Sequence, residues 1–202
     1  MARINIPDCV VEFFSYVYPD LDLNRVEFHE GIPKLFSMRK PRAITLGSWT
    51  SFKINVHFRS GEGNPCTCEG IALIGHELFH VQDVLSVGRG WGFGLIRLWY
   101  LAYVYCVIMS GFNFKRTHYL EEPAYDIHDR IEKYFESIGL NLSREGPCIL
   151  TESGITRSSD FFFQFPSNCQ SLVIRKQPRS FMKIIQHSTR RRLRGLFKLI
   201  KG

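Results

Sequence analysis

Hydrophobic residues recur at helical spacing in four stretches of the chain. Residues 71–85 are apolar on nearly every side of a helix, as expected of a helix buried in a core. Residues 91–112 hold a single charged residue, and residues 181–200 carry an apolar stripe among basic residues. Residues 120–138 are amphipathic, and their apolar stripe consists of Leu120, Ala124, Ile127, Ile131, Phe135 and Ile138. The pattern predicts a helix in each stretch.

The first of these helices contains the string His76-Glu77-Leu78-Phe79-His80, an H-E-x-x-H motif. Positions i and i+4 lie one above the other on a helix, so His76 and His80 can direct two imidazoles at one metal ion. Glu77 lies beside them, where a carboxylate can accept a proton from water. Such polar residues are costly in a core unless they are satisfied. The motif predicts a Zn²⁺ site; the alternative is two hydrogen-bonded core histidines beside a surface glutamate.

Two histidines do not complete a metal site, and the amphipathic helix offers a third ligand. At about 100° per residue, Glu121 flanks the apolar stripe, whereas Glu122 falls on the opposite, solvent-facing side. Small Ala124, one turn after Glu121, leaves room for the histidine-bearing helix. Glu122 has an argument of its own, because Asp126 lies four residues later and can orient a histidine. Pro123 would shift the phase if it lay beyond the first turn. The position relative to the apolar stripe favours Glu121 as the third ligand, and Glu122 remains the alternative.

The stretch from Trp91 to Phe112 is long and apolar enough to span a bilayer. A span there would place the two ligand-bearing helices on opposite sides of the membrane, although both must meet in one site. We therefore expect a packed scaffold helix, with association at a membrane interface as the alternative.

A length of 202 residues suits one domain with a sizeable core and room for an appendage. Acidic residues interrupt the N-terminal apolar run, so we expect no signal peptide there. The six cysteines are then expected to be free thiols in a reducing, cytoplasmic compartment. Cys66 and Cys68 are spaced like half of a second metal site, but no partner pair appears nearby. Phe161–Phe165 favours a buried strand, with an exposed substrate-binding shelf as the alternative.

The positive charge of the chain is concentrated at its C-terminal end. Residues 175–202 hold ten of the 26 Lys and Arg and no Asp or Glu; the remaining 16 basic and 19 acidic residues give residues 1–174 a charge of −3. Apolar residues recur among the basic ones, which is typical of a cationic amphipathic helix on an anionic membrane surface. The tail lacks Tyr and Trp, which disfavours nucleic acid as a partner. A solvated basic helix packed on the body explains the pattern equally well.

Three segments together resemble a known family: LDLNRVEFHEG from Leu21, RAITLGSWTSFKINVHF from Arg42 and ALIGHELFHVQ from Ala72. They resemble the extracellular contractile injection system core domain, a zinc metallopeptidase family, and its relatives with an H-E-x-x-H-V-x-Q helix. The later aromatic stretch and the segment Glu121–Tyr125 resemble the family's hydrophobic helix and its third-ligand segment. The likeness covers roughly residues 20–138. The chain departs from the family in holding Cys66-Thr67-Cys68 before the H-E-x-x-H helix and in a single glutamine after Val81, and it matches nothing of the family from about residue 140 onward.

The resemblance implies an α+β fold, with a small mixed N-terminal sheet packed on a helical zincin-like core. That core would comprise the H-E-x-x-H helix, the aromatic scaffold helix and the third-ligand helix within residues 1–174. A basic C-terminal helix, within residues 175–202, would follow. The resemblance also implies a zinc ligand set of His76, His80 and Glu121, with Glu77 as the general base.

The function expected from these features is zinc-dependent hydrolysis of a peptide or protein substrate. Glu77 would take a proton from water and pass it to the leaving amine. A donor for the developing oxyanion would come from His118, Tyr119 or Tyr125, among which the sequence does not choose. Two other classes remain open. One is a zinc-stabilised binding or assembly module without turnover, and the other is a peripheral membrane protein acting through its basic tail.

Overall fold

The computed structural model describes residues 1–34, 41–47, 53–65, 67–87, 93–111, 119–137, 172–174 and 181–201. Within these ranges, the side chains of Cys9, Val87, residues 93–97 and residues 195–201 are not described. The expected strand at Phe161–Phe165 and the candidates Cys66 and His118 lie outside the described residues.

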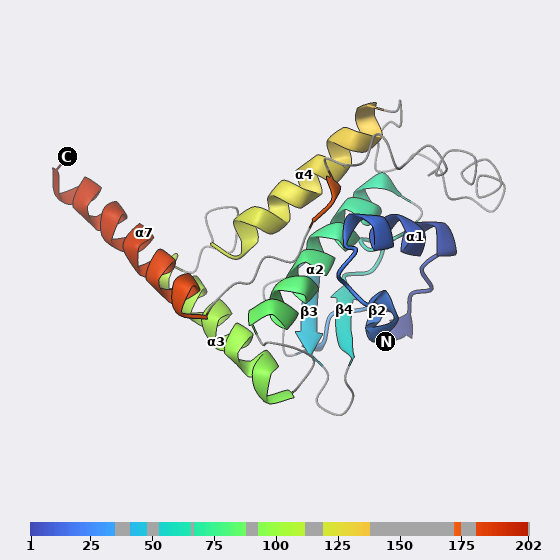
Figure 1. The fold of residues 1–202 in the computed structure, drawn as a ribbon, viewed down its shortest axis with the longest axis horizontal. Coiled ribbons are helices and arrows are strands. Elements are labelled where there is room, and N and C mark those ends of the chain that lie inside the picture. Colours follow the sequence, from blue (N-terminus) through green and yellow to red (C-terminus); the bar gives the residue numbers. More distant parts are fainter. Residues whose placement is uncertain are drawn as a thin grey trace.

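The described residues form a four-stranded mixed sheet and five α-helices, so the predicted α+β class is confirmed (Figure 1). The strands are β1 (Ala2–Arg3), β2 (Val26–Glu30), β3 (Ala43–Gly47) and β4 (Ile54–Phe58). The helices are α1 (Asp8–Val17), α2 (Cys68–Val87), α3 (Phe93–Met109), α4 (Glu121–Ser137) and α7 (Phe181–Lys201), and a 3-10 turn, η1 (Leu23–Arg25), precedes β2.

The sheet has the strand order β1-β2-β4-β3, which makes β3 an edge strand. The central pair, β2 and β4, is parallel, and the outer strands β1 and β3 each run antiparallel to their neighbour. Ile54, Val56 and Phe58 alternate along β4 and are fully buried, as period-two side chains of a central strand should be. Edge strand β3 lies beside α2, so its residues can reach the histidine-bearing helix.

Helix α2 is the core element that its sequence predicts. Every residue from Gly70 to Leu85 is buried, including the polar members of the H-E-x-x-H motif. The helix lies over the sheet, and α4 runs along its other side (Figure 1).

The amphipathic stripe of α4 faces α2 as predicted. Leu120, Ala124, Ile127, Ile131 and Phe135 are all buried; Ile138 lies outside the described residues. A glycine makes the approach close, because a Cβ at Gly75 would overlap the δ-methyl of Ile131. Close packing of α2 and α4 therefore depends on the residue directly before His76.

Helix α3 is buried on only one side. Trp99, Ala102, Cys106 and Val107 are buried, whereas Leu101, Val104 and Ile108 on the opposite side are exposed. The expected scaffold helix is thus packed against the core on one face and exposed on the other. Among the described residues, no helix has both the length and the hydropathy of a membrane span.

Helix α7 packs its first half on α3. Ile184 and Ser188 are buried, and the Ser188 hydroxyl lies 3.0 Å from the thiol of Cys106. Beyond this contact, α7 continues past the end of α3 and away from the sheet (Figure 1). The basic helix therefore starts as part of the packed body, as one of the two alternatives for the tail expected.

Candidate metal centre

Helix α2 places His76 and His80 one turn apart, with their imidazoles directed at the same point. Their Nε2 atoms lie 3.2 Å apart and both side chains are buried. The carbonyl of Gly75, just before the first histidine, accepts a 2.6 Å hydrogen bond from the buried hydroxyl of Tyr18 at the end of α1. Helix geometry directs the two rings at one point, and the hydrogen bond from Tyr18 holds the backbone just before them.

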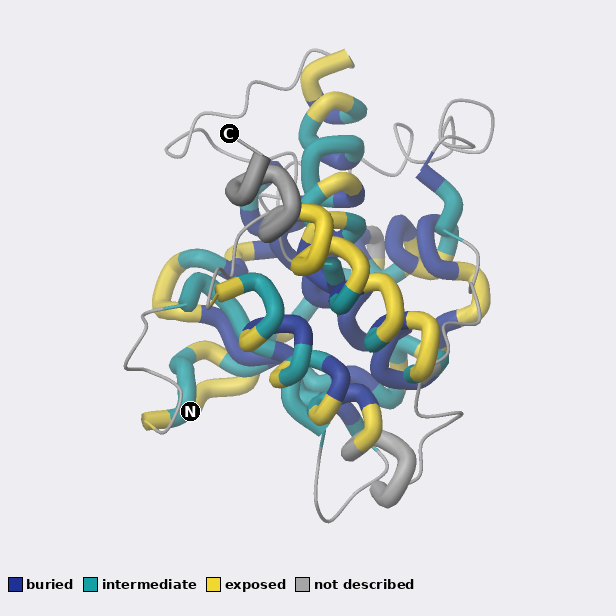
Figure 2. The backbone as a smooth tube through the Cα atoms, turned by 90° about the vertical axis from the view of Figure 1, so that its left-hand side faces the viewer, coloured by how far each residue is buried: buried dark blue, intermediate teal, exposed yellow. Residues whose placement is uncertain are grey.

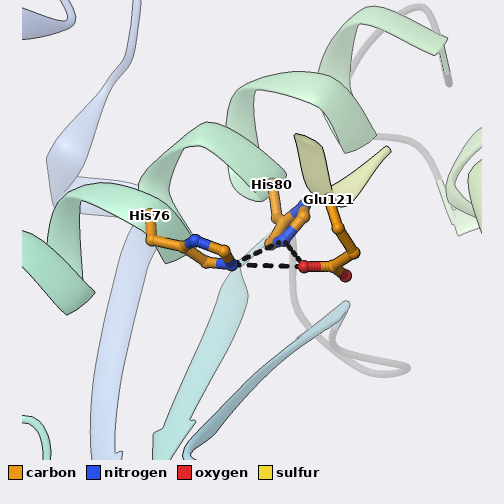
Figure 3. Close-up of side chains that lie close together, drawn as sticks. All are labelled: His76, His80 and Glu121. Atoms are coloured by element: carbon orange, nitrogen blue, oxygen red, sulfur yellow. Dashed lines mark hydrogen bonds and ion pairs between the residues drawn. The ribbon is translucent and has the colours of Figure 1, made fainter. Parts of the chain in front are cut away.

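Helix α4 brings a carboxylate to the same point (Figure 3). Glu121 Oε2 lies 3.3 Å from His76 Nε2 and 3.4 Å from His80 Nε2, and the Glu121 side chain is only 9 % exposed. The helix starts at Glu121, so Pro123 lies in its first turn, where proline is tolerated. Pro123 therefore does not change the angular positions of Glu121 and Glu122 around the helix that the sequence predicts.

Glu122 points elsewhere. Its side chain is 55 % exposed and accepts a 2.7 Å hydrogen bond from Arg191 Nη1 of α7. Asp126, which was expected to support Glu122 as a ligand, is exposed. The alternative third ligand thus faces solvent, on the side of α4 away from the histidines.

Three ligand-type atoms converge here: two imidazole nitrogens and one carboxylate oxygen. They are the one group of three or more His, Cys, Asp or Glu found in the described part of the chain with metal-ligand spacing. Two nitrogen lone pairs and an anionic oxygen at such distances repel each other unless a proton or a cation lies between them. The His76, His80 and Glu121 group can therefore hold a metal ion.

The electrostatics of this group favour a cation. Burial acts to lower the pKa of His80, but the nearby carboxylates of Glu121, Glu77 and Asp83 outweigh it and raise that pKa to about 9. Burial likewise acts to raise the pKa of Glu121, but His80 and His76 hold it well below its usual range. A site that binds a proton this strongly also attracts a divalent cation, which competes for the same nitrogen.

The second oxygen of Glu121 is held by α3. The hydroxyl of Tyr103 donates a 2.8 Å hydrogen bond to Glu121 Oε1. Burial and the adjacent carboxylate raise the pKa of Tyr103 well above its usual value, so the phenol stays a donor. The ring of Trp99, four residues earlier on α3, lies edge-on to His80 with centroids 6.0 Å apart. The buried face of α3 therefore fixes two of the three ligand side chains.

Glu77 is buried and bound from the edge strand. The hydroxyl of Thr45 in β3 donates a 2.6 Å hydrogen bond to Glu77 Oε2. The hydroxyl of Tyr100 on α3 accepts the Gly47 N–H at 2.7 Å and lies 3.3 Å from the Thr45 carbonyl. One carboxylate oxygen of Glu77 is thereby oriented by β3, which α3 in turn holds in place.

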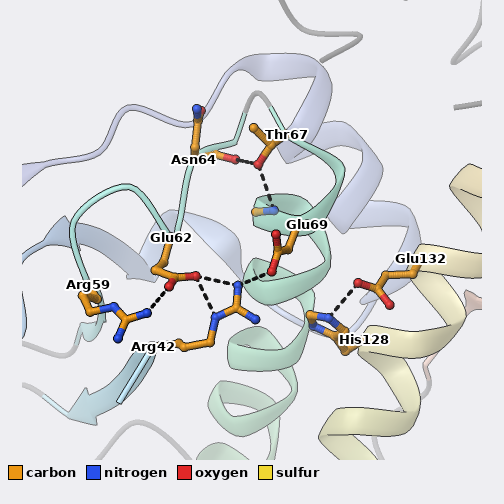
Figure 4. A network of polar contacts seen from close by, with 9 residues as sticks. Arg42, Arg59, Glu62, Asn64, Thr67, Glu69, His128 and Glu132 are labelled. Carbon is orange, nitrogen blue, oxygen red and sulfur yellow. Dashed lines mark hydrogen bonds and ion pairs between the residues drawn. The ribbon is translucent and has the colours of Figure 1, made fainter. Parts of the chain in front are cut away.

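Charged side chains tie the start of α2 to the same strand (Figure 4). Arg42, beside β3, donates to Glu62 Oε2 at 2.7 Å and to Glu69 Oε1, in the first turn of α2, at 2.5 Å. The Thr67 hydroxyl accepts the Gly70 N–H at 3.0 Å and so caps the helix. These contacts tie the first turn of α2 to the residues beside β3.

The Nδ1 atoms of His76 and His80 are buried and have no hydrogen-bond partner among the described residues. A histidine that binds a metal through Nε2 carries its proton on Nδ1, where a carboxylate or carbonyl usually accepts it. In this site the rings are oriented by packing, since Tyr125 and Trp99 lie against them.

Two of the three expected oxyanion donors, Tyr119 and Tyr125, are among the described residues and lie in different places, whereas His118 lies outside them. Tyr125 lies beside the ligands, with its ring edge-on to His76 and centroids 4.8 Å apart. Tyr119 instead stacks on His187 of α7, with centroids 4.1 Å apart. Further along α4, His128 Nε2 lies 3.1 Å from Glu132 Oε1 (Figure 4).

The sequence reasoning missed Thr45, Tyr103 and Trp99. Thr45 lies in the segment RAITLGSWTSFKINVHF, which is one of the three segments of the resemblance, so the resemblance contained a signal for it. Tyr103 and Trp99 had none, because α3 is apolar on every side and its pattern has no phase that would mark an inward face.

Cys68 and Cys106, the cysteines whose side chains are described, are buried thiols, as expected. Neither belongs to the metal-ligand group found in the described residues. Half of the Cys66 and Cys68 pair lies outside them, so the described residues do not test whether this pair binds a metal.

The chain was compared with protein-family models, with curated proteins and with solved structures. None of the three comparisons gave a match. The likeness to the injection-system core domain therefore stays a prediction from motifs, and function has to be argued from the geometry of the site.

Proposed function

We propose that this protein is a zinc-dependent peptidase whose metal ligands are His76, His80 and Glu121. The observation that carries the proposal is the triangle of ligand atoms, with sides of 3.2, 3.3 and 3.4 Å. Tetrahedral coordination at bond lengths of about 2.0–2.1 Å places ligand atoms about 3.3–3.4 Å apart, which matches those sides. Two histidines and one carboxylate also leave a fourth position open, as catalytic zinc sites do.

A bound zinc ion supplies Lewis acidity, which makes water more acidic and polarises a carbonyl group. Glu77 is the base in this proposal. Thr45 occupies Glu77 Oε2, so the other carboxylate oxygen is the one that takes the proton from water and later passes it to the leaving amine. Because Thr45 and Glu77 are both buried, Glu77 keeps its orientation between the two proton transfers.

Tyr125 is the oxyanion donor that the geometry favours. It is the expected candidate that lies against a ligand ring, whereas Tyr119 is stacked on α7. Tyr103 has a different role, since its hydroxyl already donates to Glu121. Tyr103 orients the ligand and Tyr125 stabilises charge on the substrate oxygen.

The experiment compares wild type with Glu77→Gln, and with Glu69→Gln as a matched control on the same helix. Metal content is measured by mass spectrometry of the purified proteins, and cleavage is measured on a peptide library. Loss of a general base lowers the rate by about 10²–10⁴-fold while zinc is retained. Glu69→Gln, which alters a carboxylate bound to Arg42, should keep both. Full peptidase activity in Glu77→Gln would contradict the proposal.

One observation favours a second candidate, a zinc-stabilised module without turnover. Counted as whole residues, the ligands and Glu77 are each at most 7 % exposed, and a substrate must reach them. Stoichiometric zinc, a lower melting temperature after chelation and no cleavage of the library by wild type would together support this candidate over the peptidase.

A further inference from the structure

The outer face of α3 is an aliphatic surface with no packing partner in the described part of the chain. Leu98, Leu101, Val104 and Ile108 are spaced three, three and four residues apart, which places them along one side of the helix. They are 37 %, 59 %, 55 % and 51 % exposed. A helix that is apolar all round is normally buried all round, so this face is suited to a partner outside the chain.

The first half of α7 lies beside this stripe. Tyr105, which follows Val104 on α3, has its hydroxyl 2.6 Å from that of Thr189 on α7. Figure 2 shows the two helices next to each other on one side of the molecule, with exposed positions on both. The side of α7 that carries Ile184 and Ser188 packs against α3, and both residues are buried.

The remaining sides of α7 carry aliphatic and basic residues together. Leu193, 48 % exposed, lies one turn after Thr189 and so on the side of α7 nearest to Tyr105 and the α3 stripe. Met182 is 59 % exposed on the first turn. Lys183, Arg190 and Arg194 are exposed further round the helix, and α7 contains no acidic residue. We call these residues and the α3 stripe the α3–α7 face.

We propose that the α3–α7 face binds an anionic lipid surface. Aliphatic side chains that enter the acyl boundary, flanked by cations that reach the headgroups, are the chemistry that such a surface selects. The charges argue against a second copy of the chain, because a symmetric pair would bring two arginine-rich helices together. The stripe argues against nucleic acid, which would leave it in water.

This inference is independent of the proposed peptidase. The buried face of α3 contacts Glu121 and β3, whereas the α3–α7 face lies on its other side. Vesicle binding should therefore be the same for wild type and for Glu77→Gln, and should survive removal of metal at a pH where the protein stays folded.

The test is flotation of the full-length protein with vesicles of phosphatidylcholine alone, or with about one third phosphatidylserine. Wild type should float only with the anionic vesicles. Replacing Leu101, Val104 and Ile108 by serine leaves the charge unchanged and should weaken binding at least about tenfold, because the apolar contact is lost. Arg190→Gln with Arg194→Gln should weaken it about 25-fold, at about fivefold for each arginine.

The matched control removes two positive charges from elsewhere: Arg3→Gln on β1 with Lys133→Gln on α4, both exposed in the structure. It should change binding by less than about twofold, because these residues lie outside the face. Circular dichroism confirms that each variant is folded, as expected for changes at exposed positions.

Four results would overturn the proposal. The first is equal binding to both vesicle types, and the second is binding by the serine variant as tight as by wild type. The third is a concentration-dependent dimer, seen by sedimentation velocity, that the serine variant abolishes while no vesicle binding occurs. The fourth is salt-sensitive binding to an oligonucleotide that the serine changes leave intact, again without vesicle binding.

Discussion

The candidate metal centre and the α3–α7 face reverse the usual distribution of side chains. At the metal centre, His76, His80 and Glu121 are polar and buried, and their presence in a core requires a ligand or a proton. At the α3–α7 face, Leu101 and Val104 are apolar and exposed. Each region departs from the rule that apolar residues are inside, and we propose an interaction for each: a metal ion at the first and a lipid surface at the second.

Helix α3 belongs to both regions and shows how they differ. Its Tyr103 hydroxyl is used at the metal centre, where it holds Glu121. Its Tyr105, two residues later, bonds Thr189 at the α3–α7 face. The comparison predicts that the two regions respond independently to mutation and to pH.

The largest expected effect is a difference in zinc affinity between substitutions of the two glutamates that begin α4, Glu121 and Glu122. Glu121→Gln removes the ligand charge and should weaken zinc binding by more than about a hundredfold, since even outer-sphere changes cost up to that much. Glu122→Gln should leave zinc affinity unchanged and lose only an exposed pair with Arg191, worth at most about 1 kcal/mol. Competition with a chromophoric chelator measures both. Equal losses would show that the ligand is misassigned.

The next effect is that of pH on the metal centre. Metal needs a neutral imidazole, and the pKa of His80 without metal is about 9. Zinc affinity should rise about tenfold per pH unit between pH 7 and pH 9 and then level off, as one proton is released. The stability of the metal-free protein changes in the opposite sense. A histidine whose folded pKa is raised stabilises the fold below its ordinary pKa of about 6.5, and this contribution is lost as pH rises through about 9.

The same pH range gives a direct contrast with the α3–α7 face. Its arginines stay charged throughout, so vesicle binding should be constant between pH 7 and pH 9. Isothermal titration at several pH values, run beside flotation, checks both halves. A vesicle affinity that followed the zinc curve would break the separation of the two regions.

A smaller effect on zinc affinity is expected when two tyrosines of α3, Tyr103 and Tyr105, are compared. Tyr103→Phe leaves Glu121 Oε1 without its donor and should weaken zinc binding about ten- to a hundredfold. Tyr105→Phe removes a hydroxyl of the same kind at the contact with α7 and should leave zinc affinity unchanged. If both variants bound zinc like wild type, the orienting role of Tyr103 would have to be withdrawn.

The smallest effect concerns the spacing of α2 and α4. Gly75→Ala adds a methyl group that overlaps Ile131, and should lower the free energy of unfolding by about 1–3 kcal/mol. Adding Ile131→Val removes the overlapping methyl and should restore part of the loss, which urea denaturation measures. A fully additive double mutant would mean that the two residues do not compete for this space.

How much of the site could be read from the sequence varies from residue to residue. His76 and His80 follow from helical pitch alone, because i and i+4 share a face. Glu121 follows from the phase of the α4 stripe, which held because Pro123 lies in the first turn. Glu77 was expected at the edge of the helix, and its burial against Thr45 depends on a strand more than 30 positions earlier in the chain.

Local spacing along the chain decided the helices, the shared direction of the two imidazoles and the side of α4 that carries a ligand, because each depends only on the period of a helix. The three-dimensional arrangement decided which apolar residues of α3 are buried, which hydroxyls hold Glu77 and Glu121, and how the basic helix joins the aliphatic stripe. The reason is physical: a helix that is apolar on every side has no preferred inward face, so only its neighbours determine which side meets the core and which meets water.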